Sequence, residues 1–178
     1  MKALLLTVML ALAGPARAAS PIAALAADLA AHPSATEVLQ RWCADRHIAD
    51  PAVIVAERQR GRDKPATAEV RALLHAAPGE TIRYRRVALA CGGHVLSNAD
   101  NWYRPAQLTA AMNAELDGTD HPFGAVVRPL QFHRESLEAR VLAGPRDILR
   151  NKALLETPDG TPFSLVVETY AREAVAGR

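Results

Sequence analysis

Residues 81–104 read TIRYRRVALACGGHVLSNADNWYR, and this stretch decides the fold. Two runs with the character of β-strands flank the pair Gly92-Gly93. A glycine pair supplies the positive φ angles that a tight hairpin turn needs, so the stretch predicts a β-hairpin.

The first arm of this hairpin suggests an anion site. Side chains alternate between the two faces of a strand, so Arg85 and Arg86 fall on opposite faces. Arg86 shares its face with Ala88 and Ala90, whose small side chains leave space beside a fixed positive charge. We therefore expect an anion to bind at Arg86.

Patterns on either side of the hairpin predict an α+β domain. Ser34 and Glu37 form a capping box that opens a helix, and Asp159-Gly160 is a strong turn signal between two late strands. Helices come first and antiparallel hairpins dominate the end, so we expect a single antiparallel β-sheet of about six strands with helices packed on it. Further expected helices cover 21–31, 67–77 and 107–116, and further strands cover 51–57, 130–142, 148–156 and 162–171.

The N-terminus has the features of a signal peptide. Met1-Lys2 is positively charged, residues 3–13 are apolar, and Ala16-Arg17-Ala18 is a small-x-small cleavage site. The apolar run is too short to span a bilayer. We expect residues 1–18 to be removed and residues 19–178 to form one exported, periplasmic domain. The alternative is a short hydrophobic helix that stays attached, and we expect no membrane span elsewhere.

Charge and motifs exclude several classes of function. Loss of Lys2 and Arg17 lowers the formal net charge from +2 to 0, and a neutral domain argues against a nucleic-acid surface. The basic loop 59–65 is interpreted as ordinary solvated surface. Six scattered histidines lack metal-ligand spacing, so we expect no metal and no cofactor.

The chain has two cysteines, Cys43 and Cys91. An even count permits a disulfide in an oxidising compartment. Both lie in apolar runs, so two buried thiols are the alternative, and the sequence does not give the distance between their Cα atoms.

Glu168 lies in a strand that is apolar on both faces. Burial of an unpaired carboxylate is costly, so Glu168 must be paired, protonated or lining a cavity. An apolar cavity favours the neutral carboxyl, which suits a proton donor at neutral pH. The alternative is a cross-strand ion pair with Arg86 and no ligand at all.

Three short pieces of sequence carry a resemblance to a known family. They are RYRRVALACGG at 83–93, HPFG at 121–124 and GTPFSLVVE at 160–168. Their order and spacing between about Ser34 and Tyr170 resemble the chorismate lyase (chorismate pyruvate-lyase) family, whose fold is shared with the ligand-binding domains of some transcription regulators.

The resemblance implies four site residues and one reaction. Arg86 would grip a ring carboxylate, the backbone amides of Phe123 and Ala35 would contact the ligand, and Glu168 would hydrogen-bond the oxygen at the far end of the ring. Chorismate would lose pyruvate to give 4-hydroxybenzoate without a cofactor, with Glu168 as the proton donor. Because chorismate is an intracellular metabolite and export is expected here, the alternative is a non-catalytic exported monomer that binds a small aromatic carboxylate in the same pocket.

Overall fold

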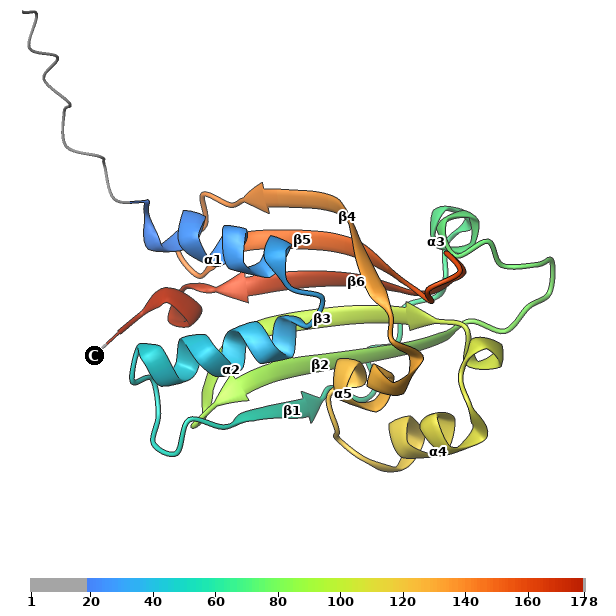
Figure 1. Cartoon of the computed structure of the whole chain (residues 1–178), viewed down its shortest axis with the longest axis horizontal. Helices are drawn as coiled ribbons and strands as arrows, with labels where there is room; N and C mark the ends of the chain where they lie inside the picture. The colour runs from blue at the N-terminus through green and yellow to red at the C-terminus, as the bar shows by residue number, and fades with distance from the viewer. Residues whose placement is uncertain (1–18, 178) are drawn as a thin grey trace, which may run out of the picture.

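The computed structural model describes residues 19–177 as an α+β domain built on one six-stranded antiparallel sheet, with strand order β1-β2-β3-β6-β5-β4 (Figure 1). The fold class predicted from the sequence is confirmed. The predicted signal peptide, residues 1–18, lies outside the described residues.

The strands are β1 Ile54–Arg58, β2 Arg83–Cys91, β3 His94–Tyr103, β4 His133–Val141, β5 Asp147–Glu156 and β6 Pro162–Ala171. The α-helices are α1 Pro21–Ala31, α2 Ala35–Asp45, α3 Ala68–Leu73, α4 Ala110–Gly118 and α5 Phe123–Val126, with 3-10 turns at Pro105–Gln107, Arg128–Leu130 and Arg172–Val175.

Polar side chains fix where the longer helices begin. The Ser34 hydroxyl accepts a hydrogen bond from the Glu37 amide, as the capping box predicts. The helix expected at 107–116 begins later, because the Thr109 hydroxyl caps it by accepting from the Met112 amide. Pro105 instead opens a separate 3-10 turn, in which proline loses no helical hydrogen bond.

The central hairpin forms as predicted. Gly92 and Gly93 take φ angles of 55° and 84°, which are strained for residues with a Cβ atom. A Cβ on Gly92 would also lie 2.2 Å from the Cβ of Ala49. The turn therefore requires glycine at position 92 for two independent reasons.

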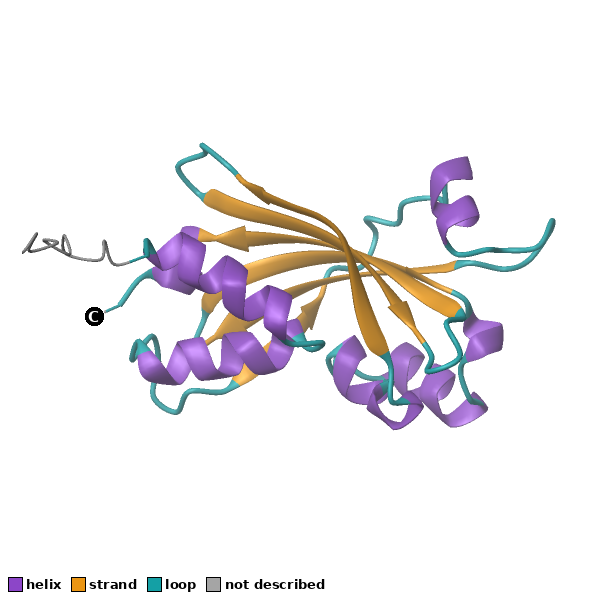
Figure 2. Ribbon diagram, turned by 45° about the horizontal axis from the view of Figure 1, so that its top comes forward, coloured by secondary structure: helices purple, strands orange, loops and turns teal. Residues whose placement is uncertain are grey.

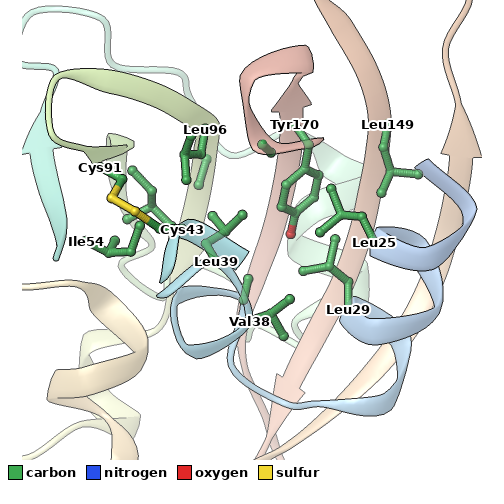
Figure 3. Close-up of a cluster of buried hydrophobic side chains, with 14 of the residues drawn as sticks. Leu25, Leu29, Val38, Leu39, Cys43, Ile54, Cys91, Leu96, Leu149 and Tyr170 are labelled. Atoms are coloured by element: carbon green, nitrogen blue, oxygen red, sulfur yellow. A yellow bond between two sulfur atoms is a disulfide. The ribbon is translucent and has the colours of Figure 1, made fainter. Parts of the chain in front are cut away.

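Helices cover the two faces of the sheet unequally. Figure 2 shows α1 and α2 at one end of one face, α4 and α5 at the other end of that face, and α3 alone on the opposite face. The α1–α2 core contains fully buried Leu25, Leu39 and Tyr170 (Figure 3). Each buried leucine stabilises the fold by roughly 1.5–3 kcal/mol.

A disulfide joins Cys43 of α2 to Cys91 at the end of β2, with 6.5 Å between their Cα atoms (Figure 3). It fastens α2 to the sheet within the same core. Of the two alternatives that the sequence left open, the structure has the disulfide.

None of the helices within residues 19–177 is both long enough and apolar enough to cross a bilayer.

Candidate functional site

A hollow of about 60 Å³ lies between the two helix groups on the helix-covered face of the sheet. One buried water needs roughly 10–15 Å³ by this kind of measure, so the hollow has room for several waters or one small molecule. Its polar side chains are those of Ser34, Thr36, Arg85, Asn101, Arg134 and Glu168. The other lining residues are Pro33, Ala35, Val87, Leu89, Ala99, Pro122, Phe123, Gly124, Phe132, Leu155 and Val166.

Strand register places Arg85 and Glu168 on the same face. Arg85 pairs with Asn101 of β3, which pairs with Val166 of β6, whereas Glu168 pairs with Ala99. The two residues are therefore two strands and two rungs apart, with about 12 Å between their Cα atoms from ideal sheet spacings. Both long side chains line the space between them.

Arg85 is a buried cation without an acidic partner among residues 19–177. Its side chain is 2% exposed, and its Nη atoms donate to the carbonyl oxygens of Leu116, Thr119 and His121 at the end of α4. The Nε–H finds no acceptor. Burial, followed by the positive charge of Arg58, lowers the pKa of the Arg85 guanidinium. Carbonyl dipoles thus stabilise the charge; the charge of Asp120 also favours it, but no carboxylate of residues 19–177 forms an ion pair with Arg85.

Glu168 is held on the other side of the hollow by two donors. Its Oε2 accepts from Arg134 Nη2 at 2.5 Å and from the Tyr170 hydroxyl at 2.8 Å. The side chains of Glu168 and Arg134 are only 6% and 9% exposed. Burial of Arg134 acts to lower its pKa, but the charge of Glu168 raises it above its ordinary value. Two donors of the protein therefore engage the Oε2 atom of Glu168.

Asn101 adds a neutral polar group to the wall. Its side-chain oxygen accepts from the Ser164 hydroxyl at 2.6 Å, and both residues are buried. This bond leaves the amide NH₂ of Asn101 on a side chain that lines the hollow.

Two backbone segments close the hollow. Ala35 is the first residue of α2 and Phe123 the first residue of α5, and both line the hollow. The amide at the start of a helix has no carbonyl of its own helix to donate to. Ala35, Phe123 and Glu168, three of the four residues predicted from the sequence, therefore lie around one cavity.

The predicted position of Arg86 is wrong. Arg86 does not line this hollow, and its side chain lies on the opposite face of the sheet from Glu168. There it donates to Gln59 Oε1 at 2.8 Å and to Asp100 Oδ1 at 2.7 Å. The predicted alternative, an Arg86–Glu168 ion pair, is also wrong, because Glu168 pairs with Arg134.

Sequence reasoning missed Arg85 and Arg134 as lining residues. The alternation along β2 separated Arg85 from Arg86 correctly, but every residue from Val87 to Cys91 is buried, so the strand itself does not indicate which face carries the cavity. Arg134 lies in a strand whose other residues are mostly exposed. The burial of the Glu168 carboxylate indicated that a cation lies beside it, and no other feature of the sequence pointed to Arg134 as that cation.

Among residues 19–177 no three His, Cys, Asp or Glu side chains are grouped so that they could hold a metal ion. The polar atoms around the hollow are instead guanidinium, carboxylate, amide and hydroxyl groups.

No protein-family model matches the sequence. The chain is 44% identical over 174 residues to the uncharacterized protein y4mC of Sinorhizobium fredii, with 85% of this chain and 73% of that protein covered.

Solved structures share the fold at low sequence identity. The effector domain of PhnF from Mycobacterium smegmatis superposes with a TM-score of 0.58 at 10% identity, covering 79% of this chain and 90% of that one. The C-terminal domain of the histidine utilization repressor from Pseudomonas syringae gives 0.52 at 9% identity, covering 68% and 93%. The ligand-binding domain of a protein described as a GntR-family regulator from Bordetella bronchiseptica gives 0.51 at 18% identity, covering 66% and 82%. The fold therefore resembles that of GntR-family effector (UTRA) domains, which share the chorismate lyase-like fold.

Proposed function

We propose that this chain, which belongs to the same family as protein y4mC of Sinorhizobium fredii, binds a small aromatic carboxylate in the hollow between α2 and α5. The observation that carries the proposal is the Arg85 guanidinium, which is buried at the hollow with no acid beside it in residues 19–177 and with its Nε–H unpaired. Burial of a charge is costly unless a counter-charge is present. A ligand carboxylate would supply that counter-charge.

The walls support an aromatic body for the ligand. Phe123 and Phe132 contribute ring surfaces, and Val87, Leu89 and Val166 contribute aliphatic surface from the sheet. Apolar walls with a few directed polar groups are the usual composition of a small-molecule site. The amide group of Asn101 and the carboxylate of Glu168 are available for a polar substituent on the ring.

The descriptions of solved structures with this fold support the binding of a ligand. The solved structures that share this fold include effector and ligand-binding domains. Ala35 and Phe123, to which the chorismate lyase resemblance assigns backbone contacts with the ligand, both line the hollow. In this proposal Arg85 takes the carboxylate-binding role that the sequence had assigned to Arg86.

Titration with 4-hydroxybenzoate tests the proposal. A ligand that binds only the native state raises the melting temperature, and 4-hydroxybenzyl alcohol is the matched uncharged probe. Charge-assisted hydrogen bonds contribute about 1.5–3 kcal/mol, so the acid should bind about ten- to a hundredfold more tightly than the alcohol. Equal affinity for the two probes, or no binding of either, would contradict the proposal.

Two neighbouring variants locate the binding group. Arg85→Gln should lose about the same ten- to hundredfold in affinity for 4-hydroxybenzoate. Arg86→Gln, which removes the same charge from the opposite face, should retain the affinity within about twofold. If Arg85→Gln does not fold, the comparison of acid and alcohol on the unmodified protein still decides the question.

The lyase reaction is a second candidate, favoured by the presence of Arg85 and Glu168 on one hollow. The Glu168 carboxylate already accepts hydrogen bonds from Arg134 and Tyr170, so we rank this reaction below simple binding. Incubation with chorismate and detection of pyruvate by coupled lactate dehydrogenase separates the two candidates. Pyruvate release that Glu168→Gln abolishes would favour the lyase.

We also infer that the protein is exported and works in the periplasm. The signal-peptide features of residues 1–18 motivate this inference, and the Cys43–Cys91 disulfide supports it, because disulfides persist in oxidising compartments. N-terminal sequencing of the protein recovered from a periplasmic fraction tests it, with Ala19 expected as the first residue.

A further inference from the structure

A second hollow, of about 170 Å³, lies on the outer side of Arg85. The loop after β1 and the start of β2 form it. Its lining consists of Arg58, Gln59, Arg60, Gly61, Asp63, Tyr84, Arg85 and Arg86. Arg85 is the one residue that lines both this outer hollow and the inner hollow.

The charges of the outer hollow do not balance. Four arginines and one acid, Asp63, line it, and one of the arginines, Arg86, is already paired with Asp100. The other three, Arg58, Arg60 and Arg85, form no ion pair among residues 19–177. Arg58 donates only to the carbonyl oxygens of Leu116 and Asp117, each at 3.2 Å.

The cations act on one another. The positive charges of Arg58 and Arg60 add to burial in lowering the pKa of Arg85. A bound anion would relieve this repulsion. Guanidinium forks match the oxygens of phosphate closely.

We propose that the outer hollow bounded by Arg58, Arg60 and Arg85 is a binding site for a small dianion of the phosphate class. A phosphate group carries about −1.5 to −2 charges at pH 7, so it can face more than one guanidinium group. This site shares Arg85 with the proposed carboxylate site, but Arg58 and Arg60 line the outer hollow alone, so binding there can be tested independently of that proposal. It also gives the basic loop 59–65 a role that its sequence alone did not indicate.

Inorganic phosphate is the probe, titrated against chloride at constant ionic strength and followed by the melting temperature. The loop supplies a matched pair of variants, because Arg60 and Arg62 are both exposed and two residues apart, yet only Arg60 lines the hollow. Saturable stabilisation by phosphate is expected in the unmodified protein. Arg60→Gln should weaken it by about tenfold, and Arg62→Gln should leave it within about twofold.

The outcomes that overturn the proposal are distinct from failure of the carboxylate site. A non-saturable phosphate effect, or equal losses in Arg60→Gln and Arg62→Gln, would show general charge attraction and no site. If phosphate competes with 4-hydroxybenzoate and Arg60→Gln does not change its affinity, phosphate binds in the inner hollow. That result also overturns the proposal. If 4-hydroxybenzoate fails to bind while phosphate binding depends on Arg60, the carboxylate proposal is wrong and the outer site stands.

Discussion

At the scale of single residues, the contact between Glu168 and Arg134 is the most consequential ion pair in the described chain. Both side chains are more than nine-tenths buried, and Tyr170 donates to the same carboxylate oxygen. Removing one partner of such a pair leaves a buried charge uncompensated, which costs far more than the intact pair contributes.

Glu168→Gln should therefore lower the free energy of unfolding by about 3–5 kcal/mol. Urea denaturation measures the loss. The control is Glu138→Gln, because Glu138 forms a longer and exposed contact with Arg140 at 3.6 Å. Exposed pairs contribute about 0–1 kcal/mol. A loss for Glu168→Gln no larger than that of the control would mean that the Arg134 charge is satisfied by other groups.

Arg85 and Arg86 lie on opposite faces of the sheet, and only part of their placement was predictable from the sequence. Alternation along a strand is a strict geometric rule, so their separation onto opposite faces was predictable. Which face holds the cavity depends on where α2 and α5 pack, and those helices are remote in sequence. Ala88 and Ala90 suggested space beside Arg86, but both are buried, at 2% and 3% exposure, and neither lines the inner or the outer hollow.

At the scale of elements, helix α2 connects the core to the hollow. Its first residue, Ala35, lines the hollow, and Cys43 near its other end is joined to β2 by the disulfide. The cysteines are 48 residues apart, so the cross-link closes a long loop in the unfolded chain. A closure of that length restricts the unfolded state substantially.

We expect the double variant Cys43→Ala/Cys91→Ala to lose about 2–4 kcal/mol of unfolding free energy. Denaturation curves with and without dithiothreitol separate the cross-link from the packing of the sulfur atoms. Reductant should lower the midpoint of the unmodified protein and leave that of the double variant unchanged. Equal midpoints for the unmodified protein with and without reductant, with the thiols shown to be free, would contradict the expectation.

Element boundaries were predictable where local chemistry decides them. The Ser34 cap, the Gly92-Gly93 turn and the Asp159-Gly160 turn all depend on residues within a few positions, and the structure has each of them. The start of α4 was misplaced, since two competing signals, Pro105 and Thr109, lie four residues apart.

At the scale of the whole molecule, the sheet order explains why the site was only partly predictable. The hairpins β2–β3 and β5–β6 are local, but the contact between β3 and β6 joins distant halves of the chain. That contact sets Glu168 on the face of Arg85, and the outer strand β4 supplies Arg134. Residue types in one strand cannot specify such pairings, so the fold class was predictable while the ion pair was not.

Lowered pKa values at three of the carboxylates, Asp28, Glu80 and Asp100, make the stability of the whole domain depend on acid. Hydrogen bonds from Arg104 are the main cause that lowers the pKa of Glu80. Burial opposes the shift at Asp28 and Asp100, but hydrogen bonds from neighbouring donors prevail and lower the pKa of both. A lowered pKa in the folded state means that the unfolded chain binds more protons in acid. The stabilisation by these carboxylates is therefore complete above their ordinary pKa values, 3.8 for aspartate and 4.5 for glutamate. It is lost as the pH falls through the lowered pKa values of the folded state.

Urea midpoints should therefore change little through these groups between about pH 7 and pH 5 and should fall steeply below about pH 4. Asp100→Asn removes one of the three carboxylates, so it should be less stable than the unmodified protein at pH 7 and should lose less stability between pH 5 and pH 3. Asp45→Asn is the control, because Asp45 is exposed and outside every ion pair of residues 19–177. An unchanged acid dependence in Asp100→Asn would mean that Lys64, Tyr84 and Arg86 hold Asp100 without favouring its charged form over its neutral one.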